Sequence, residues 1–363
     1  MLEVKFKQLL RVLEINSKIP RKKFTESTSF IQTTSYKMIS KSKIQNLFIA
    51  IGLVSFLVMI YKIGIGTIIE NLLKTQWWII PILAIWVIVY LLNTLSGLMI
   101  INTIENLRKI SFIQLYKITL STFSINTATP MGLIGGEPYK ILKLSPYLGS
   151  NKATSSVILY SAMHFLAHFL FWMLTILLSL VIIPLDSTWK ITLTITFIVC
   201  LLLFYLTIKG CKKGMVNAFF KSLKHFPMLN RLVIKFLEKN SKNIQIIDSQ
   251  IKDLHTNNPK IFYGALIIEL IARIASCTEL YLLFIAYKTS VSFLYCILIM
   301  AFTSLLANLL FFMPMQIGTR EAGFILSMKL LSLSPTLAIT ISIVTRIREL
   351  FWMMIGIILM KLK

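Results

Sequence analysis

The sequence predicts an all-α fold: a polytopic integral membrane bundle of about six to eight membrane helices, two of whose elements are broken by Pro and Gly. Hydrophobic residues make up 56% of the 363 residues, and the mean hydropathy is +0.78. Soluble domains rarely contain so large an apolar fraction. Apolar runs of about twenty residues, enough to cross the hydrocarbon core, recur along the chain.

The chain is strongly basic, with 38 Lys and Arg against 14 Asp and Glu and a formal net charge of +24. The basic residues lie mostly outside the apolar runs, as they do in the cytoplasmic loops of membrane proteins. Aromatic residues are not interleaved with them and no nucleic-acid-binding motif occurs, so we expect no nucleic-acid partner. The four Cys have neither metal-ligand spacing nor a disulfide pattern. We therefore expect no metal and no cofactor.

Residues 1–44 contain ten Lys or Arg and no apolar core typical of a cleaved signal peptide. We predict a basic N-terminal tail, with Met38 as an alternative start. The membrane domain then occupies 45–361. Its less apolar segment, 112–128, is rich in Ser and Thr, and Trp77 begins a pair suited to the membrane interface. The long apolar stretches, in chain order, are 45–62, the stretch after the Trp pair to about 101, 153–183, 189–208, 261–287, 291–312 and 335–360.

One large polar loop, 209–260, contains eleven Lys or Arg against three acidic residues. Its basic, amphipathic part, 219–239, is suited to the anionic inner leaflet, and the alternative is a solvated helix. The positive-inside rule places this loop and the N-terminus in the cytoplasm, which predicts a multi-pass protein of the inner (cytoplasmic) membrane.

This orientation constrains the topology. Four long apolar stretches lie between the two basic regions, so the segment 112–150 must enter the membrane and return to the same side. If 291–334 does the same from the outer side, Lys361 returns to the cytoplasm. We therefore predict two re-entrant elements.

Two Pro- and Gly-containing stretches resemble each other. The first is "NTATPMGLIGGEPYK" at 126–140 and the second is "PMQIGTRE" at 314–321; in both, Glu follows Pro by seven residues. Pro and Gly interrupt helices, and interrupted backbone at membrane depth is tolerated only inside protein or beside a water-filled cavity. Paired interruptions indicate a transporter binding site, and the alternative is two surface loops. The candidate binding residues here are Asn126, Pro130, Gly135, Gly136, Glu137, Lys140, Pro314, Gly318, Arg320 and Glu321.

Charged residues also occur within the apolar stretches. Glu269 and Arg273 are four residues apart, and Arg346 and Glu349 are three apart. Charges at this depth are costly unless they are paired or hydrated. They indicate either structural ion pairs or a polar cavity for a lipid headgroup or an ion. In the second case Arg320, Arg346 and Arg348 are the natural phosphate ligands, since Arg can donate two hydrogen bonds to one phosphate.

His164 and His168 are four residues apart in one apolar stretch. Two His at this spacing can bind a metal on one helix face. No third ligand is evident, so we expect both to line the cavity and to hydrogen-bond the motif segments.

These motifs resemble those of the lysylphosphatidylglycerol synthetase transmembrane-region family, also called flippase-like proteins. The stretch 126–140 is similar to the family's Asn–Pro–Gly–Glu segment, 314–323 to its second Pro–Gly–Glu segment, and 346–352 to its Arg-containing last span. The resemblance covers roughly 45–360. The chain departs from the pattern at "YSAMHFLAH", where His164 stands near an expected acidic residue.

The resemblance implies a membrane protein that binds or translocates a polar lipid, of the anionic or polyprenyl-phosphate type. In bifunctional members an aminoacyltransferase follows this domain; the sequence ends after its last span, so we expect no lipid lysylation by this chain alone. It also has only three Asp and no Asp-x-Asp motif. The alternatives are a membrane transferase acting on a lipid phosphate, with Glu137 or His164 as base, and a non-catalytic scaffold. Oligomeric state is not predicted.

Overall fold

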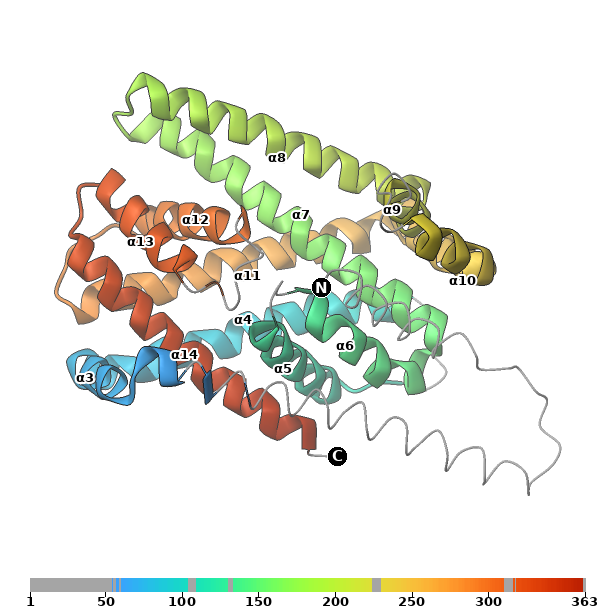
Figure 1. The fold of residues 1–363 in the computed structure, drawn as a ribbon, viewed down its shortest axis with the longest axis horizontal. Helices are drawn as coiled ribbons and strands as arrows, with labels where there is room; N and C mark the ends of the chain where they lie inside the picture. The colour runs from blue at the N-terminus through green and yellow to red at the C-terminus, as the bar shows by residue number, and fades with distance from the viewer. Residues whose placement is uncertain are drawn as a thin grey trace.

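The computed structural model describes residues 54, 57–58, 60–103, 109–129, 133–223, 230–309, 316 and 318–361. The predicted basic tail, the alternative start at Met38 and most of the stretch 45–62 lie outside these residues. The described part is helical (Figure 1). Its elements are α3 (Ile65–Thr75), the 3-10 turn η1 (Gln76–Trp78), α4 (Ile79–Asn102), α5 (Phe112–Ala128), α6 (Leu133–Leu148), α7 (Ser150–Ile182), α8 (Ser187–Lys213), α9 (Met215–Leu223), α10 (Asn230–Asn257), α11 (Pro259–Ala286), α12 (Phe293–Leu309), α13 (Thr319–Leu330) and α14 (Pro335–Lys361).

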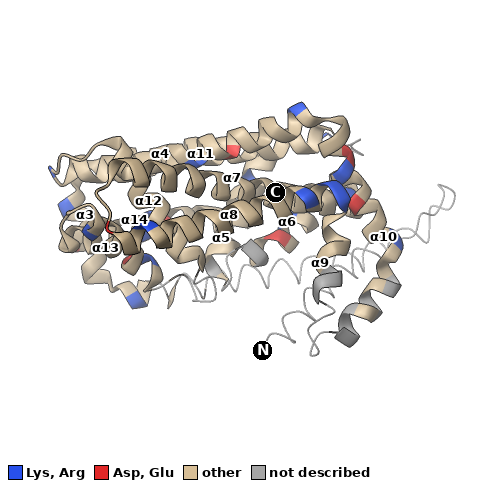
Figure 2. Cartoon of the chain, turned by 90° about the horizontal axis from the view of Figure 1, so that it is seen from above, with Lys and Arg blue, Asp and Glu red and all other residues tan. Residues whose placement is uncertain are grey.

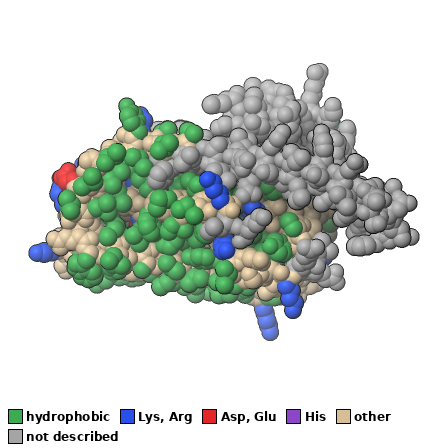
Figure 3. Space-filling view, turned by 90° about the horizontal axis from the view of Figure 1, so that it is seen from below, with side chains coloured by type: hydrophobic (Ala, Val, Ile, Leu, Met, Phe, Trp, Pro, Cys, Tyr) green, Lys and Arg blue, Asp and Glu red, His purple; other side chains and the backbone are tan. Residues whose placement is uncertain are grey.

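The all-helical membrane fold predicted from the sequence is confirmed. Four segments of the described chain are long and apolar enough to cross a membrane: Ile65–Asn102, Ser150–Ile182, Ser187–Lys213 and Pro259–Ala286. Hydrophobic side chains cover much of the surface seen in Figure 3, as lipid contact requires. Lys and Arg gather mainly toward the ends of the long helices, with a few inside the bundle (Figure 2).

The long helices run roughly parallel or antiparallel to one another (Figure 1). The main pairings are α4 with α11, α5 with α14, and α7 with α8. Gly356 lets α14 approach α5 closely, because a Cβ at this position would lie 2.5 Å from the Leu120 carbonyl oxygen. The hydroxyls of Ser121 and Ser124 donate to carbonyls of α14, at Gly356 (3.2 Å) and Met353 (3.0 Å). Small and hydroxyl residues thus join these helices, as is typical inside membrane bundles.

The first Pro- and Gly-containing stretch joins α5 to α6, which pack side by side and antiparallel (Figure 1). A capping box starts α5, with the Gln114 amide donating to Ser111 Oγ at 3.2 Å. The helix ends because Thr129 is extended, and α6 begins at Leu133. The predicted interruption is therefore real but shorter than expected: Gly135 through Lys140 lie within α6.

Close packing explains the glycines of this stretch. The Gly136 amide donates to Asn126 Oδ1 at 2.7 Å. A Cβ on Gly136 would lie only 2.5 Å from the carbonyl oxygen of Thr122. A hydrogen at this position therefore lets α6 lie directly on α5.

The second stretch joins α12 to α13, which also pack against each other. Gly318 has a positive φ of 84° and precedes α13, so a residue with a Cβ would be strained there. Glu321 completes the helix start, because its Oε2 accepts the Gly318 amide at 2.7 Å. Pro130 and Pro314, the predicted helix breakers, lie outside the described residues.

The segment 209–260 is not the single polar loop that the sequence suggests. It is mostly helical, containing the end of α8, then α9 and α10. Ile247, Ile251 and Leu254 of α10 are buried in a core shared with α7 and α11. Its apolar face therefore packs on protein, since its apolar positions recur at helical spacing. The amphipathic stretch 219–239 is divided between α9 and α10, with 224–229 outside the described residues.

Candidate functional site

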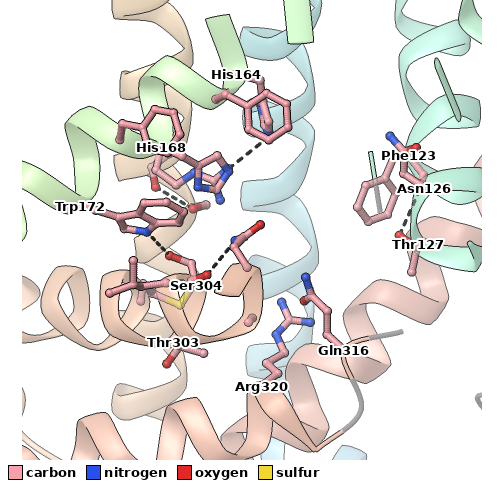
Figure 4. Close-up of a pocket in the computed structure, with 18 of the residues that line it drawn as sticks. Phe123, Asn126, Thr127, His164, His168, Trp172, Thr303, Ser304, Gln316 and Arg320 are labelled. Carbon is pink, nitrogen blue, oxygen red and sulfur yellow. Dashed lines mark hydrogen bonds between the residues drawn. The ribbon is translucent and has the colours of Figure 1, made fainter. Parts of the chain in front are cut away.

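A cavity of about 750 Å³ lies between the two helix pairs α5–α6 and α12–α13 and is also lined by α4, α7, α8, α11 and α14. Figure 4 shows His164, His168 and Trp172 of α7 on one side and Asn126 of α5 on another, with Gln316 and Arg320 reaching in from below. Both stretches singled out in the sequence therefore contribute to one cavity.

The structure brings most of the predicted binding residues together. Gly135 and Gly136 pack on α5, Glu269 lies behind His164, and Glu321 lies behind Arg346. Gly318 is exposed at the start of α13. The predicted residues that line the cavity are Asn126, Glu137, Lys140, His164, His168, Arg273, Arg320, Arg346 and Glu349.

One charged group, the histidine network, consists of Lys140, His164, His168, Glu269 and Arg273. His164 Nδ1 lies 2.8 Å from Glu269 Oε2. The Arg273 guanidinium lies 3.4 Å from His164 Nε2 and also contacts His168 Nε2. The expected direct pairing of Glu269 with Arg273 is therefore not what joins them, because the imidazole of His164 lies between the two side chains.

Several atoms of this network have no hydrogen-bond partner within the described residues. They are Glu269 Oε1, His168 Nδ1 and, beside the network, Glu137 Oε2. Lys140 is only 3% exposed, and its ammonium lies 3.5 Å from the centre of the Tyr160 ring. A cation on an aromatic face is stabilised, yet its three N–H donors stay available. This side of the cavity therefore has unused donors and acceptors.

A second group, the arginine network, consists of Glu279, Arg320, Glu321, Arg346, Arg348 and Glu349. Arg346 donates to Glu349 Oε2 and to Glu321 Oε1, both at 3.3 Å, and to the Gln316 carbonyl at 2.9 Å. Arg320 contacts the other oxygen of Glu349. Every Arg and Glu of this network therefore has an oppositely charged partner, and the predicted spacing of Arg346 and Glu349 corresponds to an ion pair.

Arg348, which the sequence suggested as a phosphate ligand, is paired with a carboxylate outside the cavity lining. It does not line the cavity, and two of its nitrogens donate to Glu279 at 2.9 and 3.0 Å. Its guanidinium lies 3.7 Å from the centre of the Trp86 ring, and Trp86 itself donates to Glu279 at 3.0 Å. Bidentate pairing and ring stacking therefore occupy this guanidinium.

The charges of the two networks and the adjoining Glu137 balance. Apart from the two His, the basic side chains are Lys140, Arg273, Arg320, Arg346 and Arg348, and the acidic ones are Glu137, Glu269, Glu279, Glu321 and Glu349. The number of basic side chains equals the number of acidic ones. The site is therefore highly polar yet formally neutral, which lowers the cost of placing it among apolar helices.

Sequence reasoning missed an aromatic row on α7. Tyr160, His164, His168 and Trp172 recur every four residues, with adjacent ring centroids 6.4, 5.0 and 5.3 Å apart. The row follows the cavity, and Trp172 Nε1 donates to Ser304 of α12 at 2.9 Å. The spacing of four residues was visible in the His pair, and continuing it along the helix would have added Tyr160 and Trp172 to the candidate site.

The cavity is open beside α8. Three of its lining residues, Ile195, Val199 and Leu203, lie on one face of that helix and are 58%, 48% and 41% exposed. They lie around the middle of Ser187–Lys213, a candidate membrane span. In a helix that crosses the bilayer, residues at this height face hydrocarbon rather than water.

A family model described as the lysylphosphatidylglycerol synthase TM region matches residues 44–357, well over half of the chain. No curated protein matches the chain, and no solved structure does. With its helical membrane fold, the chain belongs to the lysylphosphatidylglycerol synthase TM region family.

Proposed function

We propose that this protein binds the polar headgroup of a membrane lipid in the cavity and moves that headgroup between the leaflets. The observation that carries the proposal is a cavity with charged side chains inside and an apolar opening beside the middle of α8. A ligand entering from hydrocarbon needs an apolar part, and a ligand reaching Arg273 or Glu349 needs a polar one. A lipid has both.

The arrangement of the two helix pairs supports passage of a headgroup. The start of α5 follows the end of α4, and the end of α6 is separated from the start of α7 only by Gly149. The pair α5–α6 therefore starts and finishes at one end of the bundle (Figure 1). The pair α12–α13 starts and finishes at the other end, next to the connections 287–292 and 331–334. We interpret both pairs as re-entrant elements that meet at the cavity, as in transporters with broken helices.

The basic segments give the proposed orientation. The end of the bundle that contains Lys109, the α6–α7 junction and the α8–α9 junction would face the cytoplasm, with the N-terminus on the same side. Residues 45–361 would form the translocating domain in the inner (cytoplasmic) membrane, and 1–44 a basic tail. The lipid bilayer is then both the surroundings of the protein and the source of its ligand.

Reconstitution in liposomes tests the proposal. Fluorescent phospholipids in the inner leaflet should become accessible to a reducing agent outside faster with the protein than without it. The variant Arg273→Gln should lose most of this activity, whereas Glu70→Gln, which changes a 63% exposed side chain on α3, should retain it. A changed mass of the added lipid would support a transferase instead. If the added lipid neither moves nor changes in mass, the result would support a non-catalytic membrane scaffold.

A further inference from the structure

The two charged networks differ in how completely their members are paired. In the arginine network every guanidinium has a carboxylate within 4 Å, and every carboxylate has an Arg. In the histidine network and its neighbour Glu137, buried acceptors lack donors. Buried polar groups are normally hydrogen-bonded, so unpaired ones indicate a missing partner. The chemistry of the ligand therefore follows from Glu137, Lys140 and Arg273, which line the cavity, and from Glu269 behind His164.

Two cations on this side can hold an anion. Neither Lys140 nor Arg273 has a carboxylate within ion-pair distance among the described residues; the guanidinium contacts imidazoles and the ammonium contacts a ring. Both line the cavity. Arg and Lys without carboxylate partners are typical ligands of a phosphate.

Two acceptors on the same side require hydrogen-bond donors. Glu137 Oε2 and Glu269 Oε1 have almost no solvent-accessible surface and no partner within the described residues. An ionised carboxylate can only accept, so its missing partner must supply an N–H or O–H group. A quaternary ammonium has no such hydrogen, whereas a primary ammonium has three.

The balance of charge restricts the ligand further. Since the ten charged side chains of the site sum to zero, a headgroup with only a phosphate would leave a net negative charge among apolar helices. An uncompensated charge of this kind is costly, while a ligand with one charge of each sign leaves the balance unchanged.

We propose that the cavity selects a zwitterionic headgroup with one phosphate and one primary ammonium. Lys140 and Arg273 bind the phosphate, and the free oxygen of Glu137 accepts a hydrogen bond from the ammonium, while Glu269 adds negative charge from behind His164. The inference rests on the proposed function and narrows its lipid class. It also separates the two stretches noticed in the sequence: the first contacts the ligand, and the second anchors a closed ion-pair network.

Binding in detergent tests this selectivity apart from transport. The purified protein is titrated with short-chain phosphatidylethanolamine, phosphatidylcholine or phosphatidylglycerol, and the shift in its unfolding temperature gives the apparent affinity. Phosphatidylethanolamine should bind about tenfold more tightly than phosphatidylcholine, since one charge-assisted hydrogen bond is worth about that factor. Phosphatidylethanolamine should also bind more tightly than phosphatidylglycerol, which has no ammonium. Equal or tighter binding of phosphatidylglycerol would overturn the proposal.

Two variants test which residue binds the ammonium and which binds the phosphate. Glu137→Gln should reduce the preference for phosphatidylethanolamine over phosphatidylcholine, whereas Lys140→Gln should weaken both by a similar factor. Glu70→Gln is the control and should change neither. If wild-type protein moves lipids in liposomes but shows no preference in detergent, this inference fails while the proposed function stands. If it neither binds nor moves any of the three lipids, both fail.

Discussion

Arg348 of α14 and Glu279 of α11 form a bidentate ion pair, with Nε 2.9 Å from Oε1 and Nη2 3.0 Å from Oε2. Each side chain is only 1% exposed. Trp86 of α4 joins them by donating to the carboxylate and by lying under the guanidinium. This contact ties three helices together, and neither Arg348 nor Glu279 lines the cavity, so loss of the ion pair should affect stability rather than ligand selectivity.

Replacing Arg348 by Met should lower the free energy of unfolding by about 3–5 kcal/mol, because Glu279 is then left charged in an apolar interior. The double variant Arg348→Met with Glu279→Gln should recover part of this loss, since no unpaired charge remains. Thermal and denaturant unfolding in detergent would measure both. Equal stability of the single and double variants would contradict the pairing.

Gly136→Ala should disrupt the α5–α6 pair. Its Cβ would lie 2.5 Å from the Thr122 carbonyl oxygen and 2.7 Å from Asn126 Oδ1, so the helices must separate, at a cost of about 1–3 kcal/mol. Lipid movement should fall with stability, because Asn126 lines the cavity. Gly66→Ala is the matched control: no atom lies within 4 Å of its Cβ position, and helix propensity predicts a gain of up to about 1 kcal/mol. Unfolding temperatures that rank the two variants the other way would refute the close approach.

Much of the helical plan was predictable from local sequence. The apolar stretches after the Trp pair correspond to α4, α7, α8, α11, α12 and α14. Length and composition make four described segments, which contain α4, α7, α8 and α11, able to cross hydrocarbon. The short helix α3 was missed, since its 11 residues carry no long apolar run. The segment 209–260 was misjudged as a loop: its composition is polar, but its apolar residues recur at helical spacing and pack on α7.

The pairing of charges was less predictable. Spacing along one helix gave the Arg346–Glu349 contact, because residues three apart are neighbours. It failed for Glu269 and Arg273, whose partners are two histidines more than 100 positions away in sequence. Tertiary packing alone decides such contacts. For the same reason the sequence suggested equal roles for Glu137 and Glu321, although the second already has an arginine partner.

Cysteine labelling tests the re-entrant interpretation of α5–α6. Lys109 precedes α5 and Pro146 lies in the last turns of α6; both are exposed. Single cysteines there should react with an impermeant reagent from the same, cytoplasmic side, while Lys190→Cys at the start of α8 should react from the other. The four native cysteines are buried and should add little background. Labelling of positions 109 and 146 from opposite sides would show a full crossing instead.

The opening beside α8 should be sensitive to bulk on one helix face only. Val199→Trp places a large ring at the opening and should slow movement of two-chain lipids severalfold. Leu202→Trp is the control, because Leu202 is 54% exposed on the same helix but does not line the cavity. Both variants keep an apolar, lipid-exposed residue, so insertion should be unaffected. Equal rates for the two variants in the liposome assay would show that lipid does not enter past α8.

Glu137 and Glu321, which each follow a Pro by seven residues, should respond differently when their charge is removed. Glu321 accepts the Gly318 amide at 2.7 Å and the Arg346 guanidinium at 3.3 Å, so Glu321→Gln weakens a helix start and an ion pair together. Its unfolding temperature should fall, by an amount corresponding to about 1–3 kcal/mol. Glu137→Gln removes no such partner from Oε2 and relieves a buried unpaired acceptor, so that variant should fold as well as the wild type.

Lipid movement should nevertheless fall in Glu137→Gln, because a carboxylate held for a ligand contributes to binding rather than to packing. Unfolding in detergent and movement in liposomes, measured on the same preparations, separate the two effects. Glu70→Gln controls for the loss of one surface carboxylate. A stable Glu137→Gln variant with full lipid movement would remove Glu137 from the site. A fully stable Glu321→Gln variant would show that its contacts with Gly318 and Arg346 contribute little to the fold.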